Sequence, residues 1–339
     1  MKKFIALLLS IISALFVLTS CSPTLLILDG KYYQRDKGIG SNYINETCVY
    51  DVSVAYQTPY QTTDYTNLNQ TAKFVIDEGT LTTNLTNFDS DAQVKYGTTG
   101  YVYTSTLVVK GKYVINGVEQ KIENEVTSKT YFKDFIYNFE PCYSEKQVKN
   151  STLLNINNEY KVAYYEYGYT VNYGDKASTE ITVTNDEFNH LTGLQGTFDF
   201  ANYNEGAYVD NEILLFVPRT FNLSNDYSQS FKTVDVLSRK LQSMKYSTVL
   251  SNETVLIKNV NLANYTYVDK NPTLNYSGTK NVSAVLLNVK INDLFSGSAI
   301  EAYYATEQDM RHLLVEYYTK LNLNLGYLKY TLKHVTYID

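Results

Sequence analysis

One stretch of the chain carries a row of tyrosines whose spacing could build a binding surface. The tyrosines occupy alternate positions, with a valine in one place, and are Tyr165, Tyr167, Tyr169 and Tyr173. Because successive side chains of a β-strand point to opposite faces, all four would share one face. A tyrosine combines an apolar ring with a hydroxyl that needs a partner. The row therefore predicts either a ligand-facing groove for lipid, peptide or sugar, or a packed face in a chain with 34 tyrosines.

A short helix is predicted where acidic residues precede an apolar run, and Arg219 lies at its end. The side chain of Asp210 can accept hydrogen bonds from the free amides of the first helical turn. Pro218 then limits the length of the helix. Arg219 can reach a carboxylate such as that of Glu212, or the head group of a ligand. The alternative is that Arg219 only caps the end of the helix through its charge.

Two cysteines, Cys48 and Cys142, lie in the predicted β-rich part of the chain. In an exported protein such a pair can form a disulfide, which stabilises a fold by roughly 2–4 kcal/mol. The sequence leaves this open, because the distance between the two Cα atoms decides whether the bond can form. The alternative is two unrelated buried thiols.

No set of residues predicts a catalytic or metal site. The three histidines, His190, His312 and His334, lack the close spacing that is usual in zinc sites. Ser277 and Lys280 match a Ser-x-x-Lys pattern, but the companion motifs of that enzyme class are missing. Since no nucleophile has a visible base partner, we expect a protein that is not an enzyme and uses no cofactor.

The segments that must position these residues are mainly β-strands. Tyrosine, threonine and valine are frequent, and they favour pleated, half-buried surfaces. The dipeptide Asn116-Gly117 between two alternating runs predicts a hairpin turn, since both residues accept positive φ angles. The predicted fold is mostly β: a large, curved antiparallel sheet or half-open β-barrel with few short helices. One continuous sheet system is favoured, and the alternative is a soft domain boundary near residues 142–155.

The N-terminus has the order of a signal peptide, with Lys2 and Lys3 before an apolar run over residues 4–18. The run is shorter than the roughly 20 residues that span a bilayer. The sequence Leu18-Thr19-Ser20-Cys21 resembles the lipobox of bacterial lipoproteins. This resemblance implies cleavage before Cys21 and acylation of its thiol. It places the protein in the bacterial cell envelope, outside the cytoplasm and anchored to a membrane through lipid on Cys21.

These observations divide the chain into three parts. Residues 1–20 are the predicted signal peptide, residues 21–45 a lipid-anchored entry segment, and residues 46–339 a β-rich domain. The formal net charge is −6 and no basic stripe is present. A mildly acidic chain of this kind argues against nucleic acid as a partner.

Two stretches resemble exported bacterial proteins of unknown function whose fold is akin to the LolA/LolB lipoprotein carriers. The first, residues 209–219, is similar to an acid-started helix that ends in arginine, and the second, residues 297–332, to a set of closing strands. The resemblance implies a half-open barrel that binds apolar ligands or lipoproteins without catalysis. We therefore expect a non-enzymatic protein that binds a hydrophobic ligand, lipid or lipidated partner in a concave tyrosine-rich sheet. The alternative is a structural or protein-interaction module that acts through exposed β-strands.

Overall fold

The fold is described from a computed structural model of the 339-residue chain. The structure describes residues 45–59, 68–134, 139–189, 191, 193–200, 203, 208–221, 223, 228–248, 250–251, 254–255, 257–267, 276–291, 299–306 and 312–337. The predicted signal peptide, Cys21 and the entry segment up to residue 44 lie outside these ranges. No helix among the described residues has the length and apolar character needed to cross a membrane.

Within these ranges, one 16-stranded sheet contains every strand except the short pair β12 (Leu250–Ser251) and β13 (Thr254–Val255). Its first half is a meander of neighbouring antiparallel strands: β1 (Asn45–Ala55), β2 (Ala72–Asn87), β3 (Gly100–Ile115), β4 (Val118–Lys133), β5 (Pro141–Ile156), β6 (Glu159–Asn172), β7 (Ser178–Asp186) and β8 (Gly196–Asp199). Its second half contains β9 (Tyr208–Val209), β10 (Ser228–Asp235), β11 (Lys240–Thr248), β14 (Ile257–Tyr267), β15 (Tyr276–Ile291), β16 (Ala299–Ala305), β17 (Leu314–Lys320) and β18 (Tyr327–Tyr337).

Two of the tight turns that join the long strands of the first half contain asparagines with positive φ angles. Asn116 and Gly117 between β3 and β4 have φ angles of 51° and 81°, which confirms the predicted hairpin turn. Asn157 and Asn158 between β5 and β6 have φ angles of 52° and 66°. Asparagine tolerates this left-handed conformation better than most residues do, so a similar turn forms there without glycine.

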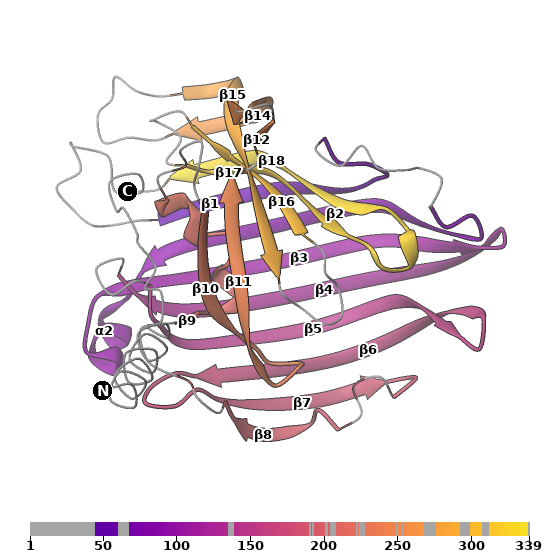
Figure 1. The fold of residues 1–339 in the computed structure, drawn as a ribbon, viewed down its shortest axis with the longest axis horizontal. Helices are drawn as coiled ribbons and strands as arrows, with labels where there is room; N and C mark the ends of the chain where they lie inside the picture. The colour runs from indigo at the N-terminus through magenta and orange to yellow at the C-terminus, as the bar shows by residue number, and fades with distance from the viewer. Residues whose placement is uncertain are drawn as a thin grey trace, which may run out of the picture.

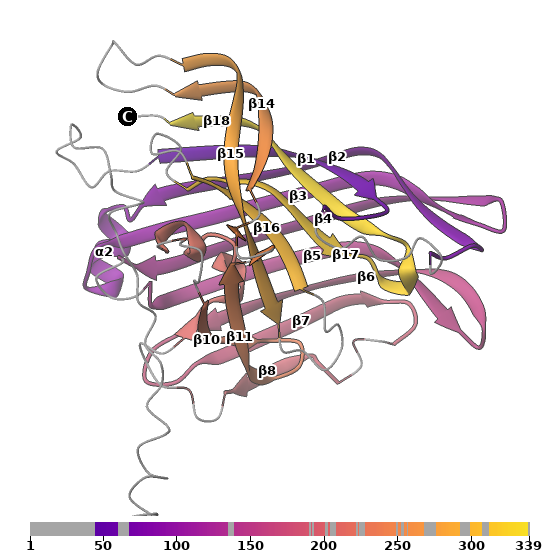
Figure 2. The same ribbon diagram turned by 45° about the horizontal axis from the view of Figure 1, so that its top comes forward.

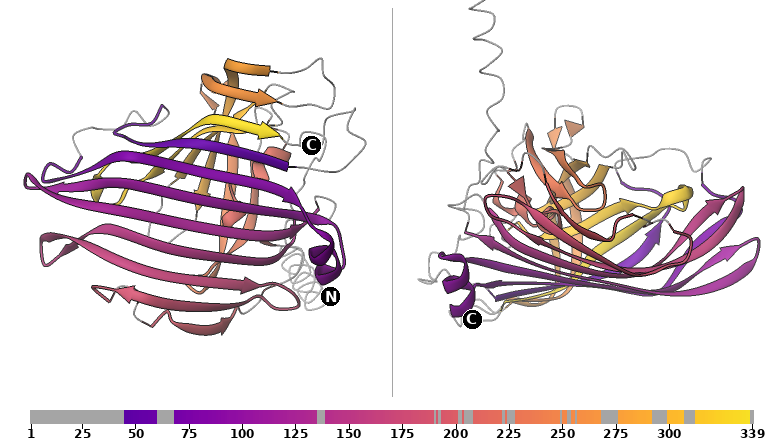
Figure 3. Two further views of the ribbon diagram at one scale, coloured as in Figure 1. Left: turned by 180° about the vertical axis from the view of Figure 1, so that it is seen from behind. Right: turned by 90° about the horizontal axis from the view of Figure 1, so that it is seen from below.

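The two halves of the sheet join through β1 and β18, which pair antiparallel along their length. From this seam the second half turns back, so that β10, β11, β15 and β16 cross over one face of the first half (Figure 1 and Figure 2). Figure 3 shows the strong curvature of the long strands. Most buried side chains form one cluster between the two halves. The observed fold is thus mostly β, a large curved antiparallel sheet that forms an open barrel, as predicted.

The segment predicted as a helix lies between the two halves of the sheet. It forms two turns of 3-10 helix, η4 (Asn211–Ile213) and η5 (Val217–Thr220), in place of one α-helix. The hydroxyl of Tyr246 on β11 donates to the carbonyl of Leu214 at 2.6 Å. The hydroxyl of Tyr304 on β16 donates to the carbonyl of Leu215 at 2.8 Å. These two carbonyls accept from the crossing strands, and Pro218 has no backbone amide to donate. A regular α-helical hydrogen-bond pattern is therefore interrupted in this segment.

The stretch near residues 142–155, where a soft boundary was an alternative, lies inside β5. This strand is hydrogen bonded to β4 on one side and β6 on the other, so the sheet is not interrupted there.

On the outer face, the helix α2 (Ser90–Tyr96) begins with Asp89 accepting from the amide of Ala92 at 2.8 Å. A third short 3-10 turn, η7 (Asn322–Asn324), joins β17 to β18.

Candidate functional site

The predicted tyrosine row lies on β6 and faces the inside of the barrel. Tyr167 and Tyr169 are buried, and Tyr165 and Tyr173 are half-buried. All four pack in a second cluster that contains Val234 of β10, so the crossing strand covers them. The row is therefore a packed face of the closed end of the barrel rather than an open groove.

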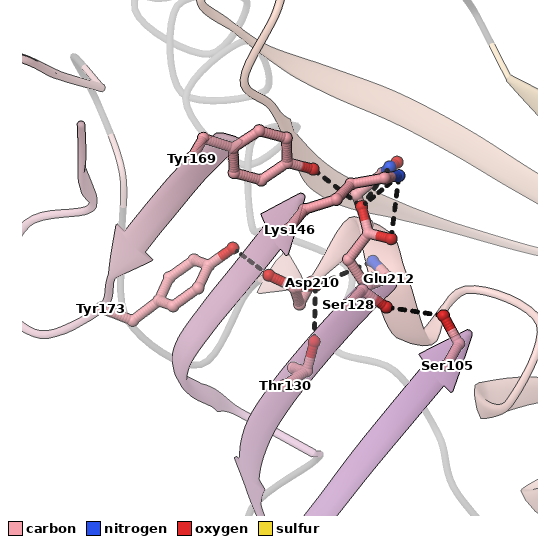
Figure 4. Close-up of polar contacts among 9 residues, drawn as sticks. Ser105, Ser128, Thr130, Lys146, Tyr169, Tyr173, Asp210 and Glu212 are labelled. Carbon is pink, nitrogen blue, oxygen red and sulfur yellow. Dashed lines mark hydrogen bonds and ion pairs between the residues drawn. The ribbon is translucent and has the colours of Figure 1, made fainter. Parts of the chain in front are cut away.

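The hydroxyls at the end of this row anchor the 3-10 segment to the sheet (Figure 4). The hydroxyl of Tyr173 donates to Asp210 Oδ2 at 2.6 Å, and that of Tyr169 donates to Glu212 Oε1 at 2.8 Å. Lys146 Nζ on β5 lies 3.0 Å from both carboxylate oxygens of Glu212. Asp210 Oδ1 in turn accepts from the amide of Glu212 at 2.8 Å, which caps η4 as the sequence predicts.

The two carboxyl groups of this network differ in their electrostatics. Burial and the charge of Glu212 raise the pKa of Asp210. Burial also acts to raise the pKa of Glu212, but the charge of Lys146 and the hydrogen bond from Tyr169 outweigh it and lower that pKa. Burial and the neighbouring carboxylates raise the pKa values of Tyr169 and Tyr173. Because these groups are bonded to one another, the network positions η4 and presents no open reactive group.

Arg219 binds a partner that the sequence analysis did not identify. Its two guanidinium nitrogens donate to the carboxylate of Glu46 on β1 at 2.6 and 2.8 Å, and both side chains are about 5% exposed or less. Arg219 is therefore neither ligand-facing nor paired with Glu212. The ion pair joins residues 173 positions apart, which no local pattern could reveal.

Cys48 and Cys142 form no disulfide, so the bond that the sequence left open is absent. Both are buried thiols. Cys48 belongs to the main core, and its Sγ lies 3.6 Å from Glu46 Oε1. Cys142 packs beneath α2 with Phe88 and Ala92. The two thiols lie on opposite faces of the sheet, which is why the bond cannot form without rearrangement.

A cavity of about 190 Å³, lined by more apolar than polar surface, lies at the other end of the barrel, and no sequence pattern singled it out. Its floor comes from β2–β5 and its roof from the chain around η7. The side chains that line it are Phe74, Leu107, Val109, Tyr113, Asn124, Val126, Asn150, Ser151, Thr152, Leu153, Lys320, Leu321, Asn322, Leu325 and Leu328. The alternation of apolar residues on β3 was visible in the sequence, but the leucines that cover it follow about 200 positions later.

The roof of the cavity is tied to the sheet by one asparagine. Asn69 donates its backbone amide to the carbonyl of Asn324 at 3.0 Å. Its side-chain amide donates to the carbonyl of Leu323 at 3.2 Å and to the hydroxyl of Tyr160 at 3.0 Å. Asn69 Oδ1 also accepts from the amide of Ala72 at 2.8 Å, at the start of β2. These bonds hold the turn before β18 above the inner face of the long strands.

Most polar groups of the cavity wall are occupied by one another. The side-chain oxygen of Asn124 accepts from the amide of Ser151 at 2.7 Å, and its nitrogen donates to the carbonyl of Ser151 at 3.3 Å. The side-chain amide of Asn150 donates to the hydroxyl of Tyr165. The rings of Phe74 and Tyr113 stack with centroids 4.8 Å apart, and burial raises the pKa of Tyr113 to about 12. The cavity therefore has a mixed surface in which apolar area exceeds polar area, and most of its polar wall groups already have partners.

A second hollow, of about 370 Å³, opens on β5–β7, and most of the residues that line it have polar side chains. Its lining residues are Gln147, Glu166, Gly168, Tyr169, Thr170, Glu180, Thr182 and Thr184. Among the described residues, no group of three or more histidine, cysteine, aspartate or glutamate side chains could hold a metal ion. This hollow therefore offers carboxylates and hydroxyls without a metal site.

No protein-family model matches the sequence, and no curated protein matches it. Among solved structures, the chain is similar to a β-barrel-like protein of domain of unknown function DUF1849 from Brucella abortus. The TM-score is 0.45 and the identity 9%, over 87% of this chain and 98% of that one. A similarity at this level says nothing about function.

Proposed function

We propose that this protein is a non-enzymatic lipoprotein of the bacterial cell envelope that binds an apolar group in the cavity of its β-sheet. The observation that carries the proposal is the cavity between β2–β5 and the chain around η7. Apolar hollows with few convergent polar groups are the usual form of small-molecule sites. The membrane attachment rests on the lipobox-like sequence before Cys21.

The size of the cavity sets the size of what it can hold. An apolar cavity of about 150 Å³ can bind benzene, whereas drug-sized ligands occupy about 300–1,000 Å³. With about 190 Å³, the site suits one ring or a short stretch of alkyl chain. The bound group is then the end of an acyl chain or an apolar side chain of a partner, and the rest of that molecule stays outside.

A fluorescent apolar probe tests this proposal. The full chain, kept in solution by an amphipathic polymer, is titrated with the probe, and its affinity is compared between two tryptophan variants. Leu107→Trp fills the cavity, and we expect it to weaken binding by about tenfold, the equivalent of roughly 1.4 kcal/mol. Val108→Trp is the control, because Val108 is the next residue on β3 and lies on the other face of the sheet. Equal affinity in both variants, or no probe binding at all, would contradict the proposal.

The alternative is an interaction module that pairs strands with a partner. One observation favours it: β8 pairs only with residues 178–181 of β7. In the described part of the sheet, residues 182–185 of β7 have no strand on that side. Such an edge can accept an extended peptide. Protection of amides 182–185 from hydrogen exchange by a partner, in a chain that binds no apolar probe, would support this alternative.

A further inference from the structure

The rim of the cavity carries a charge that its interior lacks, and it points to the chemical class of the ligand. We propose that the bound molecule is a single-chain amphiphile with an anionic head, whose tail enters the cavity and whose head contacts Lys320 and Asn322. This inference rests on the proposed function and adds the identity of the head group. Both residues are exposed and both line the cavity.

Lys320 is the only charged residue among the described residues that line the cavity. Across the part of the chain that the structure describes, it forms no ion pair. Other lysines nearby differ, because Lys329 lies 3.0 Å from Glu316 and Lys333 pairs with Asp51. In a chain with a net charge of −6, a lysine left without a carboxylate at the mouth of an apolar cavity can bind an anion from outside.

Most of the other polar groups of the lining already have hydrogen-bond partners. Asn124 and Ser151 are bonded to each other, and Asn150 is bonded to Tyr165. Asn322, by contrast, makes no side-chain hydrogen bond to any described residue. An anion cannot enter the apolar interior without a large desolvation cost. The head therefore stays at the rim, where an ammonium and an amide can donate to it.

The distribution of polarity also argues against a neutral or cationic head. A cationic head would lie beside Lys320 with no acidic residue among the lining residues to offset the repulsion. A neutral head would leave Lys320 without a partner and gain only the burial of its tail. An anionic head gains a charge-assisted hydrogen bond in addition to that burial. A medium-chain fatty acid is the simplest molecule with this combination.

Photo-crosslinking tests the inference on the full chain. The protein is placed in nanodiscs of neutral lipid and exposed to a medium-chain fatty acid that carries a diazirine at the end of its tail, or to the methyl ester of the same acid. Labelled peptides are identified by mass spectrometry. We expect the acid to label peptides that contain Leu107, Leu153 or Leu325 about tenfold more than the ester does, the ratio that one charge-assisted contact supplies.

Two variants make the result specific. Lys320→Gln should reduce labelling by the acid to the level of the ester and leave labelling by the ester unchanged. Lys240→Gln, an exposed lysine on β11, should change neither. Circular dichroism of each variant shows whether it is folded.

The other outcomes contradict either the anionic head group or the cavity as a binding site. If acid and ester label the cavity equally, or if Lys320→Gln retains full labelling by the acid, the anionic head is wrong and the apolar site remains. If neither molecule labels the cavity peptides, the proposed function is wrong as well.

Discussion

At the scale of single residues, the buried charges have the largest consequences for this protein. The Arg219–Glu46 pair lies inside the core between the sheet halves. A buried ion pair often adds little net stability, because removing two charges from water costs as much as their attraction returns. Removing one partner is different, since it leaves the other charge buried without compensation. The same reasoning applies to Glu212, whose carboxylate accepts from both Lys146 and Tyr169.

We expect Glu46→Gln to lower the free energy of unfolding by about 3–5 kcal/mol, because the buried guanidinium of Arg219 then lacks a counter-charge. The double variant Glu46→Gln with Arg219→Met should recover part of this loss. Urea unfolding of the full chain measures both. As a control, Glu123→Gln removes an exposed pair with Lys110 and should cost less than about 1 kcal/mol. A Glu46→Gln effect as small as that of the control would contradict the importance of the buried pair.

The network around Glu212 predicts a pH dependence. The pKa of Glu212 is lowered in the folded protein from its ordinary value of 4.5. Its ionised form therefore stabilises the fold above about pH 4.5, and this contribution is lost as the pH falls through the lowered pKa. Asp210 acts in the opposite sense: its pKa is raised from 3.8, so its contribution is largest below that value and is lost as the pH rises through the raised pKa.

Urea unfolding at several pH values tests this difference in sign. We expect the loss of stability caused by Glu212→Gln to be largest at neutral pH and to shrink below about pH 4.5. For Asp210→Asn the loss should be largest at acidic pH and smaller at neutral pH. Two variants with the same pH profile would show that the carboxyl groups do not titrate as separate, oppositely shifted groups.

At the scale of elements, the connections between strands decide what the inner face of the sheet can bind. The turn around η7 is short, and Leu323 and Asn324 both adopt the left-handed backbone conformation with φ angles of 55°. This conformation is strained for leucine. Gly326 closes the turn at a φ of 107°, and a Cβ atom there would lie 2.6 Å from the carbonyl oxygen of Ala55. The turn keeps this shape because bonds from Asn69 hold its carbonyls. One loop side chain thus positions the roof of the cavity.

We expect Asn69→Ala to increase hydrogen exchange of the amides at residues 320–326 by about tenfold, because it removes the side-chain bonds to Leu323 and Tyr160, worth about 1 kcal/mol each. Gln70→Ala is the matched control, since Gln70 is exposed and its side chain bonds, among the described residues, only the nearby carbonyl of Leu68. Exchange measured by mass spectrometry compares the two. Unchanged exchange in Asn69→Ala would mean that packing of the leucines alone holds the roof.

At the scale of the whole molecule, the sheet is stabilised by being folded over on itself. Strands at the two ends of the chain pair with each other, and the crossing strands cover the inner face of the first half (Figure 1). The segment of residues 210–220 lies between the halves, where Phe216 contacts the rings of Phe132 and Phe139 at 5.5 Å and that of Tyr103 at 5.8 Å. One aromatic side chain thus packs the 3-10 segment against β3 and β4.

We expect Phe216→Ala to lower the free energy of unfolding by about 3–5 kcal/mol, because removal of the buried ring leaves a cavity between the 3-10 segment and the sheet. Both sheet halves should unfold together, so near-ultraviolet and far-ultraviolet circular dichroism should give the same transition. Phe188→Ala is the control, because Phe188 is 41% exposed. Separate transitions for the two signals would show that the sheet does not unfold in one cooperative step.

Local patterns predicted the parts of this fold that depend on neighbouring residues. Alternating apolar side chains predicted the long strands, and Asn116-Gly117 predicted their hairpin, because backbone preference and turn chemistry act over a few residues. Asp210 was recognised as a cap for the same reason, although Pro218 and the tyrosines of β11 and β16 turned the expected helix into two 3-10 turns. The disulfide was left open, since only tertiary structure places Cys48 and Cys142 on opposite faces.

The sequence by itself determined the β class and the hairpin turn at Asn116-Gly117. Tertiary structure decided which face is filled and which is open. It covered the tyrosine row of β6 with β10, paired Arg219 with Glu46, and placed the leucines around η7 above β3. Each of these contacts joins residues that are distant along the chain. Such contacts depend on how the whole sheet curves back on itself, and no local preference of the backbone encodes that.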